Sequence, residues 1–326
     1  MRRREFIATL GAATGLPLAA FAQQASVPTI GFMSGRSAED SAYLVDAVRD
    51  GLRDVGYSEG ETVSITYRWA NGDYGRLPGL ASELLKLNVS IIVAVGGDPS
   101  GLAAKYATST VPIVFGMGSD PVKAGIVSSF NRPGGNATGF TLLTNRIEAK
   151  RVGLLHELVP GNSSLGALIN PNFPPAADEL NDIENAVRTI HRGVVIAKAN
   201  SDAEIESAFR GFAEQRVAGA LVAASPFFDT RRGLIIGLAA SHKIPTMYQF
   251  REFAISGGLI SYGPRIAESY KQAGSYVGRI LRGATPGDLP VLQPTRFEMV
   301  INLKTAGTLG LSIPNTMQLL ADEVVE

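Results

Sequence analysis

The feature that most constrains this chain is an alternation of strand-like and helix-like segments that occurs in two successive sets. Short apolar runs such as 90–95 (SIIVAV) and 165–169 (LGALI) are typical of strands that are buried on both faces. Longer segments with apolar residues at helical spacing, such as 40–55 and 176–190, lie between these runs. This pattern predicts parallel sheets with helices on both faces.

The length of the chain agrees with two such units. At about 150 residues per domain, 326 residues predict two domains, and a hydrophobic content of 45% supplies apolar material for two cores. We therefore expect an α/β fold with two doubly wound lobes. No short repeat and no low-complexity linker separates them.

The N-terminus has the features of an export signal. Basic residues at 2–4 precede a weakly apolar stretch, and 20–22 (AFA) fits the small-residue cleavage site of a signal peptide. We expect residues 1–22 to be removed. The run 3–7 (RREFI) also fits the twin-arginine pattern, which favours that route over general secretion. A membrane anchor is the alternative, but Gly11, Gly15 and Pro17 interrupt a stretch shorter than the ~20 residues that span a bilayer.

Composition and motifs argue against several classes of function. The 30 basic and 30 acidic side chains give no net charge and no basic stripe, which disfavours a nucleic-acid partner. The absence of cysteine excludes disulfides, thiol catalysis and cysteine zinc sites. The three histidines lack metal-ligand spacing, and no hydrolase, P-loop or dinucleotide motif occurs. We therefore expect no catalytic residues, no metal and no cofactor.

Candidate ligand-binding residues lie just beyond the predicted strands. In open parallel sheets, ligands bind at the carboxyl ends of the strands, where backbone N–H groups at helix starts attract anions. The candidates at these positions are Ser34, Arg36, Gly97, Asp98, Ser100, Ser119, Asp120, Asn170, Phe227, Phe228, Tyr248, Arg251 and Tyr262.

Their side chains suggest distinct roles in a polar small-molecule pocket. Ser34, Ser100 and Ser119 would receive a carboxylate, and Asp98 or Asp120 would take an amine. The phenylalanines and Tyr248 in the set would form the wall beside an apolar or aromatic part. Each residue also has an ordinary structural explanation, because serine, aspartate and glycine are common after strands, and both aspartates precede a proline as helix caps do.

Several motifs occur in a characteristic order along the chain. They are 65–70 (ITYRWA), 76–78 (RLP), 131–139 (NRPGGNATG), 248–253 (YQFREF), 257–263 (GGLISYG) and 300–306 (VINLKTA). As a set they resemble ABC-transporter substrate-binding proteins of the type I periplasmic binding fold, in the group that includes tryptophan-binding members. The resemblance covers the whole chain after the export signal.

This resemblance implies two lobes that are joined by a three-crossover hinge and close around a ligand. Lobe one would comprise 28–143 plus 264–290, and lobe two 144–263 plus 293–326, with crossovers near 142–145, 262–265 and 291–295. It also implies a periplasmic monomer that binds a small polar or aromatic solute, such as an amino acid or related carboxylate. The partner would be an inner-membrane ABC permease.

Two other functions remain open at this point. One is an exported enzyme that acts on a small molecule in the same cleft, which turnover of the ligand would reveal. The other is a sensor-regulator core related to sugar repressors, which would require an N-terminal helix-turn-helix where the export signal stands.

Overall fold

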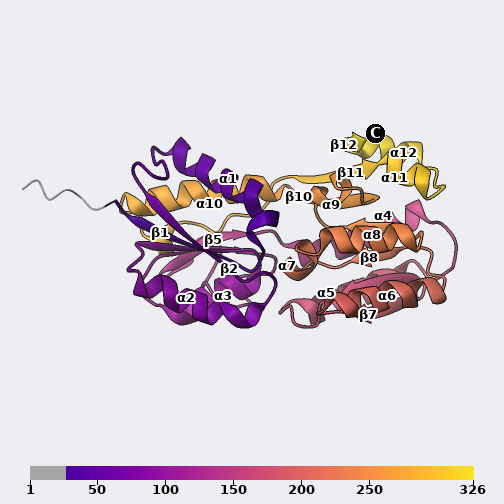
Figure 1. Ribbon diagram of the computed structural model, residues 1–326, viewed down its shortest axis with the longest axis horizontal. Coiled ribbons are helices and arrows are strands. Elements are labelled where there is room, and N and C mark those ends of the chain that lie inside the picture. Colours follow the sequence, from indigo (N-terminus) through magenta and orange to yellow (C-terminus); the bar gives the residue numbers. More distant parts are fainter. Residues whose placement is uncertain (1–26) are drawn as a thin grey trace, which may run out of the picture.

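Two α/β lobes lie end to end in the computed structural model, which describes residues 27–326 except the side chains of Asn145 and Arg146 (Figure 1). Each lobe is built around its own sheet. The expected signal peptide, residues 1–22, lies outside the described residues. No helix within residues 27–326 is both long enough and apolar enough to cross a bilayer.

The first sheet is entirely parallel, with strand order β2-β1-β3-β4-β5. Its strands are β1 (Thr29–Ser34), β2 (Ser64–Trp69), β3 (Ile91–Val95), β4 (Ile113–Met117) and β5 (Ala137–Thr141). The helical segments along this part of the chain are α1 (Ala38–Asp54), η1 (Tyr74–Arg76), α2 (Leu77–Lys86) and α3 (Asp98–Ala107).

Side chains of the central strand β3 alternate between two cores, as a strand covered on both faces requires. Ile91 and Val93 pack with residues of α1 and of the later helix α10 (Ile266–Leu281). Ile92 and Ala94 point to the opposite face and pack with residues of α2. Each fully buried aliphatic side chain of this kind contributes about 1.5–3 kcal/mol to stability.

Helix α10 packs on the first lobe, although in sequence it follows β10 (Ile260–Pro264), a strand of the second lobe (Figure 1). It packs closely along α1 because glycines remove side chains from the contact. A Cβ atom on Gly51 would lie 1.8 Å from the Lys271 carbonyl oxygen, and one on Gly274 would lie 2.1 Å from the Val48 carbonyl oxygen. Such distances are possible only for glycine.

The second sheet has the order β12-β11-β10-β9-β8-β6-β7. Its strands are β6 (Leu165–Ile169), β7 (Val194–Lys198), β8 (Ala220–Val222), β9 (Thr246–Tyr248), β10 (Ile260–Pro264), β11 (Phe297–Asn302) and β12 (Glu323–Val325). The helical segments that precede, connect or follow them are η2 (Thr144–Ile147), α4 (Glu148–Leu158), α5 (Ala176–Thr189), α6 (Asp202–Glu214), α7 (Pro226–Asp229), α8 (Arg232–Ser241), α9 (Arg251–Ile255), η3 (Pro286–Asp288), α11 (Leu303–Thr308) and α12 (Asn315–Leu320).

The predicted fold class is confirmed, with three local additions. Strand β11 runs antiparallel to β10, because the chain returns from the first lobe to the edge of the second sheet. The loops expected after β8 and β9 contain the short helices α7 and α9. The C-terminal tail adds α12 and the edge strand β12, which lack a strong apolar period in the sequence.

Candidate ligand-binding site

A cavity lies between the carboxyl ends of the strands of both lobes. It contains about 390 Å³ of space free of atoms, a volume that includes space open to solvent. Side chains of the two lobes contact each other beside it, so the lobes are closed on each other.

The walls of the cavity are largely apolar and come from both lobes. The apolar side chains are Met117, Phe140, Leu142, Phe173, Ala224, Pro226, Phe250 and Ile266. The side chains with polar atoms are Arg36, Thr144, Ser225, Asp229, Gln249 and Tyr270.

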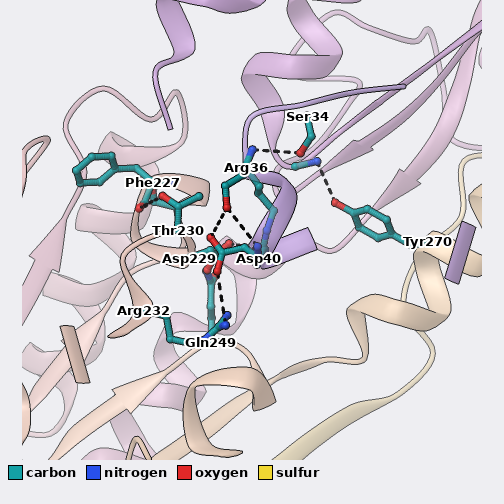
Figure 2. Close-up of polar contacts among 12 residues, drawn as sticks. Ser34, Arg36, Asp40, Phe227, Asp229, Thr230, Arg232, Gln249 and Tyr270 are labelled. Carbon is teal, nitrogen blue, oxygen red and sulfur yellow. Dashed lines mark hydrogen bonds and ion pairs between the residues drawn. The ribbon is translucent and has the colours of Figure 1, made fainter. Parts of the chain in front are cut away.

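An ion pair between the lobes forms the polar end of the cavity (Figure 2). Arg36, just after β1, donates from Nη1 to Asp229 Oδ2 at 2.8 Å. Asp229 is the last residue of the short helix α7. Gln249, just after β9, donates from Nε2 to Asp229 Oδ1 at 2.9 Å. Burial raises the pKa of Asp229 to about 6, although the Arg36 charge and the Gln249 hydrogen bond oppose the shift. At neutral pH, Asp229 is therefore ionised and paired.

Tyr74 makes a second contact between the lobes. Its hydroxyl lies 3.1 Å from Ser225 Oγ and accepts a hydrogen bond from the Phe227 backbone N–H at 3.1 Å. Its ring contacts Phe173 with the centroids 6.5 Å apart. Tyr74 also lines a wider outer groove with Phe227, whereas Ser225 lines the inner cavity. The tyrosine therefore stands between the two spaces.

The close approach of the lobes depends on a glycine after β3. Gly97 has φ +105°, and a Cβ atom there would lie 2.4 Å from Cγ of Pro226 in the other lobe. Both the left-handed backbone and the inter-lobe contact therefore require glycine at this position.

Of the predicted site residues, Arg36 and Gly97 line the inner cavity. Ser34 is buried beside it, where its hydroxyl accepts the Arg36 backbone N–H at 3.1 Å. Ser100 is fully buried and its hydroxyl has no hydrogen-bond partner among the described residues.

The two acidic candidates hold loops of the first lobe in place, Asp98 in the neighbouring loop after β4 and Asp120 in its own turn. Asp98 accepts the Gly118 N–H at 2.7 Å and also the hydroxyl and N–H of Ser119. Burial raises the pKa of Asp98, and these hydrogen bonds oppose the rise. Asp120 accepts the backbone N–H of Val122 at 2.9 Å, as a residue that caps a turn does. Asp98, Ser119 and Asp120 border a separate cleft near Pro174 rather than the inner cavity.

Other candidates lie outside the inner cavity. Asn170 donates to Ser225 Oγ at 2.9 Å and, with Phe227, lines the outer groove. Phe228, in α7, and Tyr248, the last residue of β9, lie in the core of the second lobe, on the face of the sheet that α6 and α8 cover. In that core, Tyr248 stacks on Phe253 at 4.7 Å.

Arg251 and Tyr262 lie on the side of the second lobe where β11 and β12 pair. Arg251 bonds to Glu323 and lies 3.5 Å from Glu298. Tyr262 stacks on Phe297 with the ring centroids 6.2 Å apart. Neither side chain lines the inner cavity.

The structure adds cavity residues that the candidate set did not contain. Asp229 and Gln249 lie within two residues of predicted candidates, so the strand-end rule could have included them. Phe173 follows β6 by four residues, and Tyr270 lies inside α10. No sequence signal distinguishes Tyr270 from an ordinary core residue. Among residues 27–326, no group of three or more acidic or histidine side chains could hold a metal ion.

Comparison with known proteins gives consistent matches. Residues 30–325 match the family described as ABC transporter substrate binding protein. A curated relative, the tyrosine-binding protein of Clostridioides difficile (strain R20291), is 26% identical over 275 residues, which are 83% of this chain and 79% of the relative.

Two solved structures show the same fold. An ABC domain in complex with L-Trp from Streptococcus pneumonia is 23% identical, with a TM-score of 0.83 over 92% of this chain and 100% of that chain. A ligand-free, open substrate binding protein with adhesive properties from Clostridium difficile is 21% identical, with a TM-score of 0.65 over 92% of this chain and 99% of that chain.

Proposed function

This chain belongs to the family of ABC transporter substrate binding proteins, and we propose that it captures an amino acid with an apolar or aromatic side chain for import. Capture would take place outside the inner membrane, after export by way of the N-terminal signal. The loaded, closed protein would then deliver the solute to an ABC permease.

The observation that carries this proposal is the closed cavity between the strand ends of the two lobes. Phe140, Phe173 and Phe250 offer apolar surface to a side chain, and Arg36 and Asp229 offer one charge of each sign. The names of two relatives support the same ligand class, since one is a tyrosine-binding protein and another was solved with L-Trp.

Hinge closure explains how such a site would load. The strand ends belong to different lobes, so an open form would expose the cavity and a closed form would enclose the ligand. The contacts of Arg36 and Tyr74 with the opposite lobe are those that opening would break.

Ligand binding to the mature protein tests the proposal. Titration calorimetry and thermal unfolding with L-tryptophan, L-tyrosine, L-phenylalanine and L-leucine should reveal a ligand that raises the melting temperature as its concentration exceeds the dissociation constant. Phe173→Ala should weaken that ligand roughly 30-fold, because it removes about 2 kcal/mol of apolar contact. Tyr106→Ala is the control, since Tyr106 is 84% exposed and away from the cavity.

Two results would contradict the proposal. One is equal affinity of the Phe173→Ala variant and the unchanged protein. The other is consumption of the bound compound during incubation, which would indicate the exported enzyme instead.

A further inference from the structure

The polar end of the inter-lobe cavity holds an unused donor and an unused acceptor. Arg36 and Gln249 are 2% and 3% exposed, and both line the cavity. Arg36 Nε and Gln249 Oε1 have no hydrogen-bond partner among the described residues. Both side chains are held by Asp229, one through each carboxylate oxygen (Figure 2). Buried polar atoms without partners are uncommon, and these two belong to side chains that line the cavity.

The charges at this end are balanced. Among the described residues that line the cavity, Arg36 and Asp229 are the charged ones, and they neutralise each other. The next inter-lobe pair, Arg232 with Asp40 at 3.5 Å, is also balanced and does not line the cavity. A buried ligand with one net charge would leave that charge uncompensated, which costs several kcal/mol. The cavity therefore favours ligands whose own charges sum to zero.

We propose that Arg36, Asp229 and Gln249 form a head-group subsite that selects zwitterionic ligands and rejects singly charged analogues of the same shape. The ligand carboxylate would accept from Arg36 Nε, and its ammonium would donate to Gln249 Oε1 and to Asp229. The apolar walls would hold the remainder of the ligand. This inference rests on the proposed function, because it assigns the recognition chemistry of the same cavity.

A series of indole compounds tests the charge rule directly. L-tryptophan is zwitterionic, tryptamine is a cation, indole-3-propionate is an anion and tryptophol is neutral. L-tryptophan should bind at least tenfold more tightly than tryptamine and indole-3-propionate in titration calorimetry at pH 7. Binding of either charged analogue as tightly as L-tryptophan would overturn the inference.

Two single variants should shift the preference in opposite directions. Asp229→Asn leaves the Arg36 cation uncompensated, so affinity for indole-3-propionate relative to tryptamine should rise at least tenfold. Arg36→Gln leaves the Asp229 anion, so the same ratio should fall at least tenfold. Asp40→Asn and Arg232→Gln are matched controls, because they make the same charge changes in an inter-lobe pair outside the cavity. Equal shifts in the control variants would overturn the assignment.

The double variant covers the possibility that a single variant does not fold. Arg36→Gln with Asp229→Asn restores neutrality and should fold, which circular dichroism checks. It should lose at least tenfold of the preference for L-tryptophan over tryptophol. Retention of that preference would overturn the subsite.

Failure of the proposed function would have a different outcome. If no amino acid binds but a zwitterionic compound of another class does, the charge rule stands and the amino-acid function fails. Mass spectrometry of compounds that co-purify with the protein identifies such a ligand. A co-purified ligand with net charge, or the absence of binding by every compound tested, would count against the charge rule itself.

Discussion

Two carboxyl groups and one guanidinium group are buried together between α4 and α5. Glu148 and Arg151 are fully buried, and Glu179 is 1% exposed. Arg151 Nη2 donates to Glu148 Oε1 at 2.5 Å, whereas both carboxyl oxygens of Glu179 lack a partner among the described residues. Burial raises the pKa of Glu148 to about 7. Burial, and then the neighbouring Glu148, raise the pKa of Glu179 well above its usual value.

The cluster should therefore retain a proton that the unfolded chain has already lost. A glutamate in an unfolded chain titrates near pH 4.3. Because the folded pKa is raised, the associated stability is complete below the unfolded pKa and is lost as the pH rises toward the folded one. The loss is about 1.4 kcal/mol per pH unit for each retained proton. Between pH 5.5 and 7.5, one retained proton therefore lowers the free energy of unfolding by about 3 kcal/mol.

Glu179→Gln removes this proton while preserving the shape of the protonated side chain. The free energy of unfolding, measured by urea denaturation at pH 5.5, 6.5 and 7.5, should fall more steeply with pH in the unchanged protein than in the variant. The two curves should diverge by up to about 3 kcal/mol across this range, which is the limit for one retained proton. Asp178→Asn, at the exposed neighbouring position, is the control and should run parallel to the unchanged protein. Parallel curves for Glu179→Gln would refute the reasoning.

Three further changes test other contacts. Gly51→Ala places a Cβ atom 1.8 Å from the Lys271 carbonyl oxygen, so the free energy of unfolding, measured by urea denaturation, should fall by at least about 2 kcal/mol. Unchanged stability would contradict this prediction and show that α1 and α10 can separate. Tyr74→Phe removes the hydroxyl that bonds to Ser225 across the lobes and should weaken ligand binding about fivefold by calorimetry, an outcome that equal affinities would contradict. Asp98→Ala leaves two backbone N–H groups and one hydroxyl without their acceptor and should lower the melting temperature by several degrees; an unaltered melting temperature would argue against this role.

The strands were the most predictable part of the fold. Runs such as Ile91–Val95 are apolar at every position, and a strand covered on both faces explains that pattern without further information. The return of α10 to the first lobe could not come from periodicity, because its apolar stripe fits either sheet. The family resemblance supplied that assignment. The antiparallel direction of β11 depends on where the chain returning from the first lobe meets the second sheet, and no local sequence pattern encodes that position.

The candidate site was predictable by location but not by side chain. The strand-end rule led to Arg36 and Gly97, which line the cavity. It also included Tyr248, which the structure makes the last residue of β9, so the alternation of side chains along the strand directs its ring into the core. The pairing of Arg36 with Asp229 joins residues that are 193 positions apart and belong to different lobes. Local sequence patterns contain no signal for such a contact.

The position of α10 has a consequence for how the chain matures during synthesis. All five strands of the first sheet have been made once Thr141 has emerged, yet Tyr270 and Val277, which cover one side of that sheet, come much later. Until then the nascent chain exposes the part of this apolar face that α1 does not cover. The N-terminal lobe thus reaches its final packing only after most of its neighbour has been translated, and a fragment ending before residue 266 should aggregate rather than fold.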